Sequence, residues 1–258
     1  MHKNRLVLFG LLLLTAQLLS FCGRSSESVN LPAPDIQPVY VTQDFPSVVR
    51  VFSNGQLCTG IFVSPRALLT ASHCAQSNSN VIVQTTSGRF ESNTVIKNGP
   101  GREGDSRDLA AVIFSSNIMD PRLIFRIGPA SLGETIRVVG FGCSDSLNRG
   151  DSGIKRTGTN VIFRISEYLE ILTPVPAPSS RRILGPANRA GSCFGDSGGP
   201  MLKAIPNGFT VVGLDHAIIA EGSQQVSAYT NLYSANNLNF LRSVNSQFQL
   251  GLEGINSP

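Results

Sequence analysis

The hydrophobic pattern of the first half predicts short strands separated by turns. Segments rich in Val, Ile, Leu and Phe alternate with clusters of Gly, Pro, Asn and Ser, as in antiparallel sheets. The run Leu109–Phe114 is apolar throughout, which is typical of a strand buried on both faces. The strands expected in this half cover residues 45–52, 59–63, 67–70, 80–86, 90–97 and 109–114.

The second half repeats this pattern after residues 115–127, which lack a regular period and are expected to link two halves. Near the end, apolar residues recur at intervals of three, three and four, which predicts a helix over residues 234–248. The strands expected here cover 136–141, 160–166, 201–204, 210–214 and 225–232, with long turn-rich loops at 143–159 and 173–197. Two antiparallel β-barrels and a closing helix satisfy this order, so the predicted fold class is all-β.

The N-terminus has the pattern of a signal peptide. Lys3 and Arg5 precede an apolar stretch, Leu6–Leu19, that is shorter than the ~20 residues a membrane-spanning helix needs. The following Leu-Ser-Phe-Cys, which ends at Cys22, resembles a bacterial lipobox, in which the cysteine is lipidated; ordinary signal-peptide cleavage nearby is the alternative. The predicted domains are a signal peptide at 1–22, a flexible tether at 23–40, barrels at 41–122 and 123–233, and a helix at 234–250.

Composition narrows the class of protein. Hydrophobic residues make up 41% of the 258 residues and charged residues 15%, which excludes a disordered chain. The net charge of +4 falls to +2 without Lys3 and Arg5, and no basic cluster predicts a nucleic-acid partner. The five cysteines form no C-x-x-C pair and only two histidines lie outside the signal peptide, so neither a metal site nor a cofactor is expected. If Cys22 carries lipid, four cysteines remain for disulfides in an exported protein.

The strongest chemical signal is the segment Gly-Asp-Ser-Gly-Gly-Pro at 195–200. A serine hydroxyl becomes a nucleophile only when a base takes its proton. Flanking glycines admit a carbonyl substrate and let backbone N–H groups point at a developing oxyanion. A polar turn is the plain alternative. A second Gly-Asp-Ser-Gly at 150–153, which also spells Arg-Gly-Asp-Ser with Arg149, lacks the following Gly and Pro and is interpreted as chance.

The candidate base is His73, at the end of an apolar strand and next to Cys74. A bridge from Cys74 to Cys58 would staple the loop that presents the imidazole, and would stabilise the fold by ~2–4 kcal/mol. The base needs an orienting carboxylate. Asp108 directly precedes the apolar run and can be buried there, whereas Asp105 is a nearby competitor deeper in the loop 98–107.

Three blocks together resemble the signature of the chymotrypsin/trypsin-like serine proteases, in the family's order of His, Asp and Ser. They are residues 70–74, 107–110 and 192–200, and residues 139–142 resemble the family's Gly-aromatic-Gly strand. The similarity covers residues 45–248, and the lipobox points to a bacterial lipoprotein of this family. The resemblance implies two six-stranded Greek-key barrels and a C-terminal helix.

The resemblance also implies roles. Ser197 would attack the scissile carbonyl to form an acyl-enzyme, with His73 as general base and then acid, and with Asp108 orienting His73. The N–H groups of Gly195 and Ser197 would form the oxyanion hole. Asp196 would be the buried carboxylate that shapes the nucleophile loop.

The chain departs from the family in its activation and its cysteines. No Ile-Val-Gly-Gly-like segment precedes Pro46, so trypsin-style zymogen cleavage is not expected, and Asp196 needs another partner. Some bacterial relatives use an arginine, for which Arg137 is the candidate. The loops of Cys143 and Cys193 are neighbours in the family fold, which implies a Cys143–Cys193 bridge.

The specificity pocket departs as well. Gly191 stands where trypsin-like members carry an aspartate, beside Ser192, so the floor lacks a charge for Lys or Arg. Ile218 and Ser227 would narrow the walls, which favours a small apolar residue before the cut. His216 aligns with the adjoining strand and is expected to be structural, with a hydrogen bond near Asp108.

These observations predict a secreted serine endopeptidase. We expect a monomer that acts on polypeptide substrates, without nucleic acid and with membrane contact only through lipid on Cys22. Its place would be the cell envelope (an outer-membrane lipoprotein or the periplasm) or the extracellular space. The alternative is a catalytically inactive protease fold kept as a binding module at the envelope, against which the intact Ser, His and Asp argue.

Overall fold

Two antiparallel sheets build the protein in a computed structural model that describes residues 39–75, 80–102, 105–144, 149–174, 189–221 and 224–256. These residues all belong to one compact unit, Pro34–Pro258. The predicted signal peptide, the lipidation site Cys22 and the tether up to residue 38 lie outside the described residues. Within the described ranges, no helix is both long and apolar enough to span a membrane.

The first sheet is a half-barrel whose two end strands are consecutive in the chain. Its order is β6-β5-β2-β3-β4-β8-β7. Residues 90–97 were expected to form one strand, but the chain bends at Asn93, so β6 pairs with β5 while β7 pairs with β8. The strands are β2 Val48–Ser53, β3 Gln56–Ser64, β4 Ala67–Thr70, β5 Val81–Thr85, β6 Gly88–Ser92, β7 Thr94–Lys97 and β8 Ala110–Ile113.

The second sheet closes into a six-stranded barrel, β11-β10-β13-β14-β15-β12, because β12 pairs with both β15 and β11. Its strands, with two short additions, are β1 Tyr40–Val41, β9 Arg126–Ile127, β10 Thr135–Gly140, β11 Arg156–Ile165, β12 Tyr168–Pro174, β13 Pro200–Ile205, β14 Gly208–Glu221 and β15 Gln224–Asn231. The all-β prediction is therefore confirmed. Strand β12 was not predicted, because the buried Glu170 at its centre, paired with Arg164, interrupts the apolar pattern.

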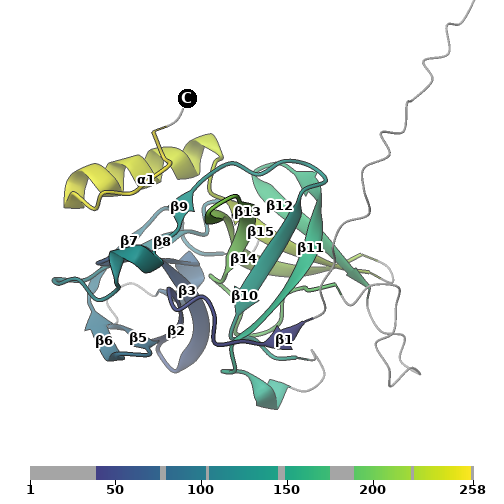
Figure 1. The fold of residues 1–258 in the computed structure, drawn as a ribbon, viewed down its shortest axis with the longest axis horizontal. Helices are drawn as coiled ribbons and strands as arrows, with labels where there is room; N and C mark the ends of the chain where they lie inside the picture. Colours follow the sequence, from purple (N-terminus) through teal and green to yellow (C-terminus); the bar gives the residue numbers. More distant parts are fainter. Residues whose placement is uncertain are drawn as a thin grey trace, which may run out of the picture. The chain divides into compact units, whose positions relative to one another are not determined.

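The predicted helix is present as α1, Ala235–Phe248. Figure 1 shows it in yellow, after the strands of the second sheet. Leu241 and Val244 are fully buried, in a hydrophobic core that takes Val48 and Ile61 from the first sheet and Leu202 from the second. The apolar face predicted from the sequence thus packs on a core that the two sheets share.

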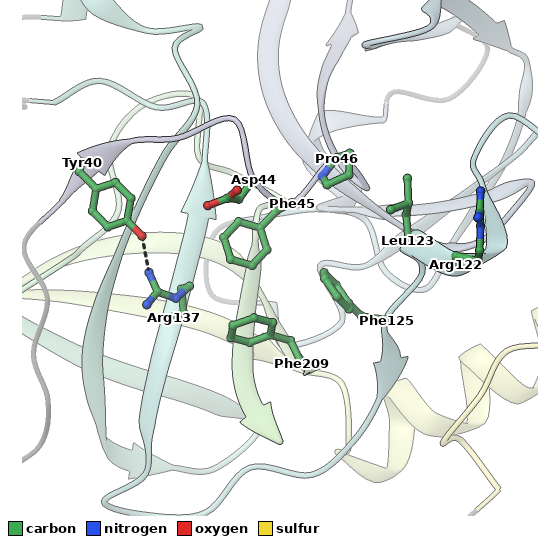
Figure 2. Close-up of a pocket in the computed structure, with 9 residues that line it drawn as sticks. All are labelled: Tyr40, Asp44, Phe45, Pro46, Arg122, Leu123, Phe125, Arg137 and Phe209. Carbon is green, nitrogen blue, oxygen red and sulfur yellow. Dashed lines mark hydrogen bonds between the residues drawn. The ribbon is translucent and has the colours of Figure 1, made fainter. Parts of the chain in front are cut away.

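A pocket of about 430 Å³ opens beside three phenylalanines, Phe45, Phe125 and Phe209. Figure 2 shows their rings turned toward one another, and the ring centroids lie 5.3 to 6.3 Å apart in edge-on contacts. Arg137 also lines this pocket, where it donates a hydrogen bond to the hydroxyl of Tyr40 at 3.2 Å. None of the predicted active-site residues lines the pocket.

Candidate active site

His73 is held from both sides of a short 3-10 turn, Ser72–Cys74, that follows β4. On one side Cys74 forms the predicted disulfide with Cys58 on β3, with a Cα–Cα distance of 6.1 Å. On the other side Ser72 Oγ donates to the carbonyl of Gly99 at 2.7 Å. The backbone that carries the imidazole is therefore held in place on both sides. The side chain of His73 keeps 27% of its surface exposed.

Asp108 approaches His73 from the start of the buried run, and its side chain is fully buried. Its Oδ1 accepts the backbone N–H of His73 at 2.9 Å and its Oδ2 lies 2.7 Å from His73 Nδ1. Burial alone would raise the pKa of Asp108, but hydrogen bonds from His216 and His73 outweigh it and hold that pKa well below its usual value. The competitor Asp105 is instead paired with Arg107 at 3.1 Å.

His216, on β14, makes the hydrogen bond that was expected near Asp108. Its Nδ1 lies 2.7 Å from the same Oδ2, and its side chain is 3% exposed. The side-chain atoms of His73, Asp108 and His216 that could ligate a metal ion lie within 4.8 Å of one another. Both imidazole nitrogens lie at hydrogen-bond distance from Asp108 Oδ2. We therefore interpret these contacts as N–H···O hydrogen bonds and not as a metal site.

Ser197 lies on the loop 195–200, and its backbone contacts β3 and the segment that follows His73. The carbonyl of Ser197 accepts the N–H of Thr59 at 2.9 Å and lies 3.6 Å from the disulfide-bonded Sγ of Cys74. Thr59 Oγ1 also donates to the carbonyl of Gly195 at 2.7 Å. The backbone of Ser197 is thereby fixed against the residue that follows His73, and Ser197 itself is partly exposed.

Among the described residues, the N–H groups of Asp196 and Gly199 donate hydrogen bonds within the loop around Ser197, whereas those of Gly195 and Ser197 do not. The carbonyl of Phe194 accepts from Cys143 N–H and from Ser152 Oγ, each at 3.2 Å. Since this peptide is trans, the N–H of Gly195 points the opposite way, which a φ of 104° at Gly195 permits. Among the described residues, the N–H groups of Gly195 and Ser197 donate no hydrogen bond, as an oxyanion hole requires.

Asp196 holds this loop through two backbone donors. Its Oδ1 accepts from Gly142 N–H at 2.7 Å and its Oδ2 from Cys193 N–H at 2.9 Å. A Cβ on Gly142 would lie 2.2 Å from Oδ2, so only glycine admits the carboxylate there. Burial raises the pKa of Asp196 to about 6, although the two N–H groups and the positive charge of Arg156 lower it in part. The prediction that Arg137 is the partner of Asp196 is wrong, because the cation that lowers the pKa of Asp196 is Arg156, on β11.

Arg156 also ties the loop 141–156 together. It donates to the carbonyl of Gly142 at 2.8 Å and to Asp151 Oδ2 at 2.9 Å. Asp151 in turn accepts from Ser144 N–H at 3.0 Å, and the predicted Cys143–Cys193 disulfide is present. The second Gly-Asp-Ser-Gly, interpreted from the sequence as chance, thus contacts the segment that carries Gly195, through Ser152 and the carbonyl of Phe194. Asp151 bonds to Ser144 and Arg156 within this loop, whereas Ser152 reaches the carbonyl of the distant Phe194.

We expect Arg156→Met to lower activity at pH 7 by about tenfold and to restore part of it near pH 9. Without the guanidinium, the pKa of Asp196 rises above about 6, and the ionised form that accepts both N–H groups is reached only at higher pH. Arg156→Lys keeps the charge without the planar set of donors, so its pH profile should match that of the unchanged protein. Equal losses at all pH values in both variants would contradict this role of charge.

The residues that the sequence predicts for the specificity pocket fall into two groups. Ser192 N–H donates to Ser227 Oγ at 2.9 Å, and Ser227 lies directly opposite Ile218 in the β14–β15 pairing, so these three lie together. Gly191 precedes them and is partly exposed. His216 is instead hydrogen-bonded to Asp108.

The sequence did not reveal Asp215, which is 4% exposed and accepts a short hydrogen bond from Ser192 Oγ. Burial, aided by the charge of Asp196, raises the pKa of Asp215 well above its ordinary value. The neutral acid is therefore favoured. Asp215 is thus a buried polar group that contacts Ser192.

Comparison with known proteins shows similarity to one family and to two venom proteins. The family model Trypsin matches residues 38–238. A snake venom serine proteinase 14 from Crotalus adamanteus is 26% identical over 59% of this chain, and rhinocerase 4, a venom serine protease from Bitis rhinoceros, is 25% identical over 58%. Each alignment spans 64% of the relative's own length.

Proposed function

The chain belongs to the trypsin family, and from this premise we propose that it is an exported serine endopeptidase that hydrolyses peptide bonds through an acyl-enzyme. The observation that supports this most is the fully buried Asp108 hydrogen-bonded to His73, beside a loop whose free N–H groups flank Ser197. The two disulfides support an oxidising, exported setting.

The proposed roles follow from these contacts. Asp108 holds His73 with its Nδ1 protonated, which leaves Nε2 as the base for the hydroxyl of Ser197. The tetrahedral oxyanion accepts hydrogen bonds from the N–H groups of Gly195 and Ser197. His73 then passes its proton to the leaving amine, and water releases the acyl group by the same steps. Neither a metal nor a cofactor takes part in this scheme.

We also propose a small apolar residue before the cut. Ile218 opposite Ser227 narrows the pocket wall, and the acid behind Ser192 is favoured in its neutral form. Lipid on Cys22 would hold the enzyme at a bacterial envelope, and the protein would act as a monomer on polypeptides.

Cleavage of casein by the purified protein tests this function. The proposal predicts new peptides whose cut sites follow Ala, Val or other small residues, as identified by mass spectrometry. If folded protein binds casein without cutting it, the inactive binding module is the better account. Cuts mainly after Lys or Arg would refute the pocket proposal and leave the peptidase standing.

A further inference from the structure

A buried side-chain amide on α1 holds the loop that leads into Asp108. Asn237 lies in the first turn of the helix and is fully buried. Its Nδ2 donates to the carbonyl of Asn231, at the end of β15, at 2.8 Å and to the carbonyl of Ser106 at 3.1 Å. Its Oδ1 accepts a hydrogen bond from Asn98 Nδ2 at 2.7 Å. The helix is thereby joined to the strand β15 and to both ends of the loop before Asp108.

The partners fix the orientation of this amide. A backbone carbonyl only accepts hydrogen bonds, so the NH2 group of Asn237 must face the two carbonyls and its oxygen must face Asn98. Asp at this position would set an oxygen against each carbonyl, and an aliphatic side chain would leave the buried partners without a hydrogen bond. The position therefore requires both the donor and the acceptor of an amide.

Asn98 extends this contact to the far side of Asp108. The N–H of Asn98 donates at 2.8 Å to the carbonyl of Leu109, the residue directly after Asp108. Ser106, which accepts from Asn237 directly, lies two residues before Asp108. One buried amide therefore restrains the backbone on both sides of the aspartate.

The same segment also reaches the turn that carries His73. The carbonyl of Gly99 accepts from Ser72 Oγ at 2.7 Å. Gly101 approaches the turn so closely that an added Cβ would lie 2.4 Å from the backbone nitrogen of His73. Because His73 Nδ1 and Asp108 Oδ2 are only 2.7 Å apart, a shift of this segment would change how the two side chains meet.

We propose that Asn237 is a positioning residue, which fixes the backbone on both sides of Asp108 and so the place of its carboxylate beside His73. This inference rests on the proposed function. Among the described residues, no hydrogen bond of Asn237 reaches His73 or Ser197, so its effect on the rate must pass through the loop that carries Asp108. The C-terminal helix thereby contributes to catalysis as well as to packing.

Asn237→Ala removes all of these side-chain hydrogen bonds. It should lower kcat by about 10- to 100-fold, because a small misplacement of a group that orients the base has effects of this size, and KM should change by less than about threefold. Asn98→Ala removes only the link between the two amides and should lower kcat by about three- to tenfold. This milder variant tests the proposal if Asn237→Ala does not fold.

Asn245→Ala is the matched control, because it removes the same side chain from the same helix. Asn245 Oδ1 accepts the N–H of Leu252, in the segment that follows α1, at 2.9 Å. The hydrogen bonds of Asn245 reach neither flank of Asp108. We expect its kcat to stay within about twofold of the unchanged protein, even if its thermal stability falls.

A double-mutant cycle separates positioning from stability. In Asp108→Ala the carboxylate that Asn237 positions is absent, so a further Asn237→Ala should change the remaining rate by less than about twofold. The readout is the rate of labelling by a fluorophosphonate, followed by mass spectrometry because the variants are slow, with thermal unfolding recorded for each protein. Asn98→Ala is placed in the same cycle.

A loss of rate by the same factor with and without Asp108, or a loss of thermal stability alone, would show that Asn237 is structural, and the inference would fail. An equal loss in Asn245→Ala would also refute it, because that residue does not reach the loop. If the unchanged, folded protein is not labelled at all, the proposed function itself fails.

Discussion

Ser197→Ala lowers kcat for peptide hydrolysis by about six orders of magnitude, the loss expected when the nucleophile of a Ser-His-Asp group is removed. The loop that carries Ser197 is fixed by Thr59, whose N–H donates to the Ser197 carbonyl. The variant should keep its fold, since the hydrogen bonds that Ser197 makes to other described residues use its carbonyl. Steady-state kinetics on a peptide cleaved by the unchanged protein, with circular dichroism as a check on folding, measures this.

Ser152→Ala is the matched control, because Ser152 lies in the second Gly-Asp-Ser-Gly. Its hydroxyl donates to the carbonyl of Phe194, which also accepts the N–H of Cys143. We therefore expect a loss of a few fold at most, about that of one neutral hydrogen bond. Activity retained in Ser197→Ala but lost in Ser152→Ala would reverse the assignment of the nucleophile.

Asp108→Asn should lower kcat by about four orders of magnitude, the drop known for this substitution in a Ser-His-Asp protease. An amide has one acceptor and one NH2 donor. If its oxygen faces the two imidazoles, its NH2 opposes the backbone N–H of His73, which cannot change. If it turns over, its NH2 faces both Nδ1 atoms, and the imidazoles must move their protons to Nε2. His73 then has no free Nε2 to accept the proton of Ser197.

Asp105→Asn removes the same charge three residues earlier and should leave kcat nearly unchanged, because Asp105 pairs with Arg107 at the surface. For both variants kcat is measured at saturating substrate. We expect KM to change little in either of them. Equal losses in both variants would mean that the charge of the loop, and not the position of Asp108, supports catalysis.

The sequence alone indicated the fold class and the chemical groups, because these depend on local patterns. Strand runs such as Leu109–Phe114 and the apolar face of α1 are periodic, and the Gly-Asp-Ser-Gly-Gly-Pro segment is contiguous. Both disulfide pairings were also expected correctly, Cys58–Cys74 from the segment around His73 and Cys143–Cys193 from the resemblance to the family. The extension of β14 past Leu214 was missed, since the buried polar residues Asp215 and His216 interrupt its apolar pattern.

The contacts that hold the site in shape were out of reach, because they join residues distant in sequence. Thr59 bonds to Gly195 across 136 positions, and Gly142 to Asp196 across 54. Arg137 and Arg156 both lie on strands of one barrel, and nothing in the sequence says which side chain points toward Asp196. The second imidazole on Asp108 depends on the register of β14, where the pairing with β15 shifts between Asp215 and Ala217.

The central claim is that Ser197 is a nucleophile activated by His73. Its most direct test is mass spectrometry of the protein after reaction with a fluorophosphonate, with peptide mapping of the modified residue. The account predicts one adduct per chain, on Ser197, that is absent in Ser197→Ala and retained in Ser152→Ala. A folded, unchanged protein that takes up no label, or that carries it on another serine, would contradict the account.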